Sequence, residues 1–138
     1  MNILIVDDDE TVREFLKFIL ERDGFNTSIA VDGEEGINKV NSEHPDLVIV
    51  DMMLPKKSGF EVIKALQTPE LIDIPVIVIT GKFVDDSLRR TVELEPNVKE
   101  YILKPIKPPY LLYRIHTILG TISPEEKAIE EKKKILEE

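Results

Sequence analysis

The chain has 138 residues and a mass of 15.8 kDa, which suits one domain with its own core. Its 27 acidic and 18 basic residues give a net charge of −9, so direct binding to the phosphates of DNA or RNA is not expected. Cysteine is absent, which excludes disulfides and thiolate metal sites; no membrane-spanning run or secretion signal is evident, and we expect a cytoplasmic protein.

The first half of the chain alternates short apolar runs with amphipathic segments. The predicted elements are a strand at 2–6, a helix between Asp9 and Gly24, a strand at 25–31, a helix at 34–42, a strand at 47–50 and a helix at 60–66. The first helix has apolar residues three and four positions apart on one face: Val12, Phe15, Leu16, Ile19 and Leu20. The strand at 25–31 alternates apolar and polar residues, which indicates a position near an edge of the sheet.

The second half continues the same alternation. It predicts a strand at 76–79, a polar helix at 85–95, a strand that ends at 101–103, and a helix from Pro108 to Gly120. Strands without internal alternation are typically buried on both faces, as in parallel sheets. The pattern therefore predicts an α/β fold, a doubly wound five-stranded parallel sheet with helices on both faces.

A further helix is predicted beyond Gly120. Ser123, Pro124 and Glu126 have the pattern of a helix N-terminus, and the following residues are mostly Glu and Lys. Its apolar positions form a narrow stripe that is too short for a coiled coil: Ala128, Ile129, Ile135 and Leu136. This C-terminal helical extension is expected either to dock on a protein surface or to remain solvated.

Four predicted strands end at residues suited to phosphoryl chemistry. These residues are Asp7, Asp8 and Asp9 after the first strand, Asp51 after the third, Thr80 after the fourth and Lys104 after the fifth. The carboxyl ends of parallel strands meet at one edge of the sheet, where such folds bind ligands. In the strand order 2-1-3-4-5, the first and third strands are neighbours where the winding reverses. We therefore expect these side chains to share one crevice.

Carboxylates in one crevice repel each other unless a lysine, a raised pKa or a hard cation relieves the repulsion. Mg²⁺ fits best, because it takes oxygen ligands and keeps waters that leave room for phosphoryl oxygens. Such an ion would neutralise charge on a transferring phosphoryl group. Alternatively, residues 7–9 form only a solvated turn in which Asp9 caps the next helix. The residues at the neighbouring strand ends favour the binding site.

These motifs together resemble the receiver domain of two-component response regulators. The resemblance rests on residues 3–9, on 46–51 followed by Met52, Met53, Leu54, Pro55 and Gly59, on Thr80-Gly81, and on Lys104-Pro105. It covers residues 2 to about 120 and implies the flavodoxin-like form of the fold. We accordingly expect a receiver domain at 1–120 and a charged helical tail at 121–138.

The resemblance also implies roles for individual residues. Asp51 would accept the phosphoryl group, and Lys104 would contact the phosphoryl oxygens. Mg²⁺ would be bound by Asp7, Asp8, Asp51 and the backbone carbonyl of Met53. The Lys104–Pro105 peptide bond would be cis, which would direct the lysine into the site.

Two further pairs are expected to act after phosphorylation. Thr80 would give its hydroxyl to the phosphoryl group and Tyr101 would turn inward, so that together they act as a switch. Met53 and Lys82 would flank the path of the water that hydrolyses the acyl phosphate. Met53 offers no good hydrogen bond to orient that water, so slow self-dephosphorylation is predicted. Lys82 would either attract the water or keep it away from the acyl phosphate.

The sequence thus predicts a phosphorylatable signalling switch that catalyses only its own phosphorylation and dephosphorylation. Its expected partners are a histidine kinase or histidine phosphotransfer protein and an unidentified downstream protein, with a phosphorylation-dependent dimer as one consistent outcome. A scaffold that never takes phosphate is disfavoured because every expected site residue is present. A haloacid-dehalogenase-type phosphohydrolase is disfavoured because Met53 stands where that family has a second aspartate.

Two other features bear on this interpretation. His44 and His116 are the only histidines, and both are expected at the surface, so the phosphoryl group must come from another molecule. Residues 94–99 replace the Gly-Ala or similar pair that receivers commonly have before the last strand. We expect a longer and differently shaped loop there.

Overall fold

The computed structural model of the chain describes residues 1–81 and 85–137. Its strands are β1 (Asn2–Val6), β2 (Asn26–Ala30), β3 (Leu47–Val50), β4 (Val76–Thr80) and β5 (Val98–Leu103). Its helices are α1 (Glu10–Arg22), α2 (Gly33–Glu43), α3 (Gly59–Ala65), α4 (Asp86–Glu93), α5 (Pro108–Leu119) and α6 (Pro124–Glu137). Strands and helices alternate as predicted, up to the two consecutive helices at the C-terminal end.

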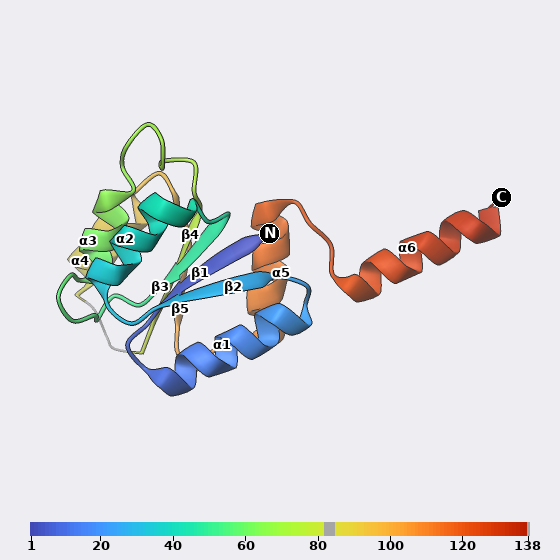
Figure 1. Cartoon of the computed structure of the whole chain (residues 1–138), viewed down its shortest axis with the longest axis horizontal. Coiled ribbons are helices and arrows are strands. Elements are labelled where there is room, and N and C mark those ends of the chain that lie inside the picture. Colours follow the sequence, from blue (N-terminus) through green and yellow to red (C-terminus); the bar gives the residue numbers. More distant parts are fainter. Residues whose placement is uncertain (82–84, 138) are drawn as a thin grey trace.

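The sheet is parallel throughout, with the strand order β2-β1-β3-β4-β5 (Figure 1). In the pairing of β1 with β3, Val6 lies opposite Val50, so these neighbouring strands end at the same level. The predicted doubly wound, flavodoxin-like fold is confirmed, and the winding reverses between β1 and β3. Residues that follow these two strands must therefore lie side by side.

Each face of the sheet has its own apolar core. Alternate strand residues such as Leu4 and Val6 pack with α2, α3 and α4, whereas Ile3 and Ile5 pack with α1 and α5. Figure 1 shows these two groups of helices on opposite sides of the sheet. The central strands β1, β3 and β4 are therefore apolar along nearly their whole length, as predicted from the absence of alternation. This packing gives the strand ends a rigid base.

The unusual residues 94–99 form an irregular connection between α4 and β5. Leu94 is 82% exposed, whereas Asn97 is buried and its side-chain oxygen accepts a hydrogen bond of 2.6 Å from Gln67. The pairing of β4 with β5 shifts register so that Lys99 has no partner residue in β4. A bulge of this kind adds local twist at the start of β5.

Two positions differ from the sequence-based expectation. Phe15 was predicted on the buried face of α1, but its side chain lies at the margin of that face and is 40% exposed. His116 was predicted at the surface, but only 12% of its side chain is exposed, because it contacts Asp23 and Thr121 and packs against the ring of Phe25. Helical spacing identifies a face, but neighbouring elements decide its limits.

The C-terminal helix α6 extends away from the rest of the chain (Figure 1). The Ser123 hydroxyl accepts a hydrogen bond of 3.2 Å from the Glu126 amide, as expected for the predicted helix start. All described residues from Pro124 onward are exposed, so the described part of this helix does not dock on its own domain. Within the described part of the chain, no helix is both long and apolar enough to cross a membrane.

Candidate functional site

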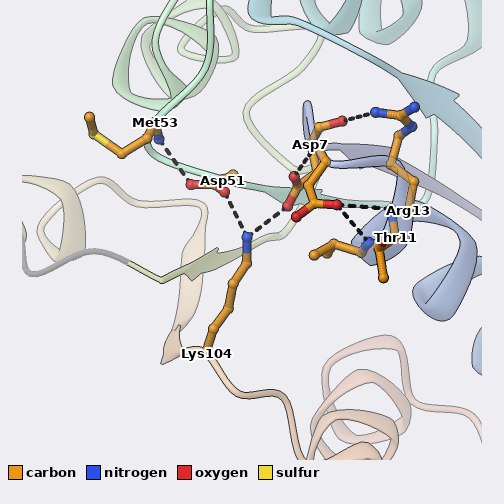
Figure 2. Close-up of polar contacts among 8 residues, drawn as sticks. Asp7, Thr11, Arg13, Asp51, Met53 and Lys104 are labelled. Atoms are coloured by element: carbon orange, nitrogen blue, oxygen red, sulfur yellow. Dashed lines mark hydrogen bonds and ion pairs between the residues drawn. The ribbon is translucent and has the colours of Figure 1, made fainter.

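The site lies at the carboxyl ends of β1 and β3, on the loops that follow them (Figure 2). The Asp7 amide donates to the carbonyl of Ala30 at 3.2 Å, and the Asp51 amide donates to the carbonyl of Val6 at 3.0 Å. These bonds continue the sheet pattern by one residue beyond the strands. Asp7 and Asp51 are thereby placed on neighbouring, rigid segments.

Three carboxylates converge here. One oxygen from each of Asp7, Asp8 and Asp51 lies within 4.8 Å of the others. Asp7 and Asp51 are buried, whereas Asp8 is exposed. The sequence-based prediction that these acids share one crevice is confirmed as a matter of geometry. Clustered carboxylate oxygens open to solvent on one side suit Mg²⁺, which prefers oxygen ligands and retains waters.

Lys104 provides the positive charge in contact with this cluster. Its Nζ lies 2.8 Å from Oδ2 of Asp51 and 3.1 Å from Oδ2 of Asp7. Burial by itself would lower the pKa of Lys104, but Asp51 and then Asp7 raise it overall, so the amine stays protonated. The Lys104–Pro105 bond is cis, as expected from the resemblance.

Backbone amides hold the two buried carboxylates in fixed orientations. Oδ1 of Asp51 accepts from the Met53 amide, and Oδ1 of Asp7 accepts from the Asp9 amide, each at 2.9 Å. Burial raises the pKa of Asp7, although the Asp9 amide and Lys104 act in the opposite direction. Each carboxylate oxygen has a second lone pair, so an oxygen that already accepts a hydrogen bond can also coordinate a cation.

Glycine permits the close packing of the loop that carries Asp51. The Gly59 amide donates to the carbonyl of Met52 at 3.1 Å and closes this loop. A Cβ at Gly59 would lie only 2.3 Å from the carbonyl oxygen of Asp51. A residue with a side chain would therefore displace the backbone next to the carboxylate.

Two hydroxyls lie buried toward β5. Thr80 is fully buried at the end of β4, and the next residue, Gly81, borders the Lys104 side chain, since a Cβ there would lie 3.3 Å from Lys104 Cδ. Within the described residues, neither the Thr80 nor the Tyr101 hydroxyl has a hydrogen-bond partner. The structure brings Thr80 to the same edge as the acids. Lys82 lies outside the described residues.

Tyr101 is already buried in this structure, whereas the resemblance implies an inward turn on phosphorylation. Only 9% of the residue is exposed, and the guanidinium of Arg89 lies over its ring at 4.6 Å from the centroid. Burial raises the pKa of the Tyr101 hydroxyl, and the nearby Arg89 only partly opposes this. An arginine over an aromatic face is an attractive arrangement.

Sequence reasoning missed one residue next to the site. The Arg13 side chain donates from Nη1 to the carbonyl oxygen of Asp7 at 2.9 Å (Figure 2). The sequence did contain a signal for this contact. Arg13 lies in the first turn after the predicted cap at Asp9, and a long side chain at that position can reach back to the residues before the helix. The Asp9 cap itself is confirmed, since its carboxylate accepts from the amides of Thr11 and Val12.

The arrangement has a defined chemical capacity. Asp51 is a buried carboxylate with a lysine on one oxygen, next to two further acids that suit a divalent cation. Positive charge on both sides of a carboxylate is what transfer of a phosphoryl group to it requires. No histidine lies in this cluster, so a phosphoryl group would arrive from outside.

Comparison with known proteins gives a consistent result. Residues 3–116 match the family model of the response regulator receiver domain. The chain is 38% identical over 117 residues to the alkaline phosphatase synthesis transcriptional regulatory protein PhoP of Bacillus subtilis, covering 85% of this chain and 48% of that protein. It is also 38% identical over 123 residues to the phosphate regulon transcriptional regulatory protein PhoB of Escherichia coli, covering 88% and 53%.

Solved structures show the same relationship. A putative response regulator from Chloroflexus aurantiacus superposes with a TM-score of 0.77 at 33% identity, covering 86% of this chain and 97% of that one. A CheY-like receiver domain protein from Methanospirillum hungatei gives a TM-score of 0.74 at 31% identity, covering 96% and 97%. The chain spans about half the length of the curated relatives named above.

Proposed function

The chain belongs to the response regulator receiver domain family, and from that premise we propose that it is a signalling switch phosphorylated on Asp51. The observation that carries the proposal is the buried Asp51 carboxylate, held by the Met53 amide and by Lys104 beside two further acids. Asp7 is already bonded to Lys104 and the Asp9 amide, and Asp8 is exposed. Asp51 makes equivalent contacts, so its choice as the nucleophile over Asp7 follows the resemblance to receiver domains, in which the acid after the third strand accepts the phosphoryl group.

The chemistry follows from these contacts. An oxygen of Asp51 attacks the phosphorus of a phosphohistidine on a partner protein, the N–P bond breaks, and an O–P bond forms. The Lys104 ammonium, already 2.8 Å from Asp51, pairs with the phosphoryl oxygens as they arrive. Mg²⁺, when bound by Asp7, Asp8, Asp51 and the Met53 carbonyl, supplies further positive charge for the transferring group.

The response to phosphorylation is assigned to Thr80 and Tyr101. The Thr80 hydroxyl is buried and unpartnered within the described residues, so it is available to a phosphoryl oxygen. A bond there would favour one arrangement of the β4–α4 region, and the buried Tyr101 of β5, which lies under Arg89 of α4, would carry that preference to the surface. Met53 and Lys82 are proposed to regulate access of the hydrolytic water.

The proposed partners are a histidine kinase or histidine phosphotransfer protein, and a downstream protein that binds the face formed by α4, β5 and α5. We place this exchange in the cytoplasm and propose a receiver unit at 1–120 with the tail at 121–138 as a separate segment. Two curated relatives carry the words transcriptional regulatory protein in their names. With a net charge of −9, the present chain is not proposed to contact DNA itself.

Incubation with acetyl phosphate and Mg²⁺, followed by intact mass measurement, tests the proposal. We expect one stable adduct with the mass of a single phosphoryl group, and we expect Asp51→Asn to abolish it. Glu61→Gln, which alters an exposed acid in α3, is the control and should leave the adduct unchanged. Continuous release of phosphate would instead indicate a phosphohydrolase, and no adduct would indicate a scaffold. An adduct that persists in Asp51→Asn would refute the assignment of the nucleophile.

A further inference from the structure

The loop between β1 and α1 carries two of the three clustered acids, and its backbone is held in part by the Asp7 amide bond to Ala30 and the Asp9 amide bond to Asp7 Oδ1. The pairing of β1 with both neighbouring strands ends at Val6, so the carbonyl of Asp7 lies beyond the sheet ladder. A backbone carbonyl in a partly buried position needs a donor. The donor that the structure provides is the Arg13 guanidinium, 2.9 Å from this oxygen.

Arg13 reaches the loop from a well-fixed position. Its own amide donates to the Asp9 carbonyl at 3.0 Å, which closes the first turn of α1, and the Asp9 carboxylate caps the same turn. The side chain is half-buried and turns back toward the strand (Figure 2). This contact joins α1 to Asp7, the first residue of the loop, so Asp8 lies between two anchored neighbours.

Asp8 depends on this anchoring more than the other acids do. Asp7 and Asp51 each bond to Lys104 and to a backbone amide, whereas the exposed Asp8 side chain makes no hydrogen bond within the described part of the chain. The loop backbone therefore sets the position from which the Asp8 side chain projects, and within the described residues no side-chain bond adds to this. That backbone is held at Asp7 by Arg13 and at Asp9 by the helix cap.

Arg13 also brings charge to the cluster. Within the described residues, Lys104 is the single cation that bonds to any of the three carboxylates, and it contacts Asp7 and Asp51. The guanidinium of Arg13, bound to the backbone of Asp7, adds a second positive charge to the same loop without occupying a carboxylate oxygen. The oxygens that a cation would use remain open.

We propose that Arg13 is a positioning residue for the Mg²⁺ site: through the Asp7 carbonyl it holds the β1–α1 loop so that Asp8 faces Asp7 and Asp51. This inference rests on the proposed function, because it assumes that these acids bind Mg²⁺. Residues that orient metal ligands typically change metal affinity by about 10- to 100-fold when they are removed. Arg13 acts on the ligands and does not itself contact the phosphoryl group.

The test is a titration of the unphosphorylated protein with Mg²⁺, followed by the NMR shifts of the backbone amides of residues 7–9. Arg13→Ala should weaken Mg²⁺ binding about tenfold or more. Arg22→Ala removes the same charge from an exposed position in the last turn of α1, and its affinity should stay within about twofold of the wild type. Equal affinities for Arg13→Ala and wild type would overturn the proposal.

A further variant separates the hydrogen bond from the charge. Arg13→Gln keeps a donor without the charge and should recover part of the lost affinity, and it also serves if Arg13→Ala does not fold. Loss of the positive charge by itself would favour Mg²⁺ binding, so a weaker affinity in Arg13→Ala reports the lost hydrogen bond. If Arg13→Gln recovers none of that affinity, the positioning role is wrong. At saturating Mg²⁺, Arg13→Ala should take phosphate from acetyl phosphate at nearly the wild-type rate, and a rate that stays low there would also contradict action through the metal.

Asp8→Ala distinguishes failure of this inference from failure of the proposed function. If Asp8→Ala abolishes Mg²⁺ binding and Arg13→Ala does not weaken it, only the role of Arg13 is refuted. If Asp8→Ala binds Mg²⁺ as the wild type does, the acids do not form the metal site, and the metal role in the proposed function fails with it.

Discussion

Replacement of Asp8 by asparagine should make the metal-free protein more stable, although it removes a proposed Mg²⁺ ligand. Without a cation, Asp7, Asp8 and Asp51 hold three negative charges within 4.8 Å, and Lys104 bonds to only two of them. Asparagine has nearly the same shape as aspartate and carries no charge. The substitution therefore relieves repulsion without opening a cavity.

The size of the effect can be worked from the geometry. Because Asp8 is exposed, a water-like dielectric applies, and each pair of charges at the stated separation costs about 0.9 kcal/mol, or about 1.7 kcal/mol for two pairs. Loss of a negative charge near the start of α1 removes roughly 0.3–1 kcal/mol of favourable interaction with the helix dipole. Attraction of Asp8 to Lys104 and Arg13 offsets part of the remainder, so the net gain is at most about 1 kcal/mol, equivalent to no more than roughly 4 °C in Tm for a domain of this size.

Thermal and urea unfolding in the presence of a chelator measure this gain. Addition of Mg²⁺ at ten times its Kd should stabilise the wild type by about 1.4 kcal/mol and leave Asp8→Asn nearly unchanged. In Mg²⁺ the wild type should then be as stable as Asp8→Asn, or more stable. Because the repulsion is between charges, the advantage of Asp8→Asn in chelator should shrink in about 1 M NaCl, where the Debye length is only about 3 Å.

Glu10→Gln is the matched control. Glu10 is an exposed acid in the first turn of α1, outside the carboxylate cluster, so its neutralisation removes only the favourable interaction with the helix N-terminus. It should lower stability slightly, the opposite sign to Asp8→Asn. If Asp8→Asn is less stable than the wild type in chelator, or if both variants change stability equally, repulsion within the cluster is not the dominant effect.

Three further predictions concern the neighbouring residues. Met53 is half exposed beside Asp51, so Met53→Asn should accelerate loss of phosphate from the purified phosphoprotein in Mg²⁺ by orienting water; an unchanged or slower decay would contradict this. Burial raises the pKa of Tyr101 above its usual 10.0, so tyrosinate absorbance should appear at higher pH in the folded protein than in urea. Because the pKa of Tyr110 is raised too, Tyr101→Phe should reduce this difference without abolishing it. The associated stability is complete below pH 10 and is lost as the pH rises through the folded-state value. Gly59→Ala forces a Cβ against the Asp51 carbonyl and should lower the free energy of unfolding by about 1–3 kcal/mol in urea. Gly81→Ala should cost less, because its Cβ would meet only Lys104 side-chain atoms, none closer than 3.3 Å.

The sequence alone determined the fold and the membership of the site. Apolar runs without alternation required a sheet covered on both faces, and parallel pairing then required that the residues after β1, β3, β4 and β5 meet at one edge. Asp7, Asp51, Thr80 and Lys104 could be assigned to one crevice on this basis, because their position relative to the strand ends is a local property of the chain. The start of α1 could be predicted in the same way, because the capping residue Asp9 lies next to the first residues of the helix.

How these residues are held follows from the packing of the elements against each other, which the sequence pattern did not reveal. The contact between Arg13 and the Asp7 carbonyl depends on the angle between α1 and β1, which no local pattern specifies. The burial of His116 likewise depends on Asp23 and Thr121 approaching from other parts of the chain. Local spacing determines which face a residue occupies, whereas distances between side chains on different elements follow from how the helices pack on the sheet, and that packing involves the whole chain at once.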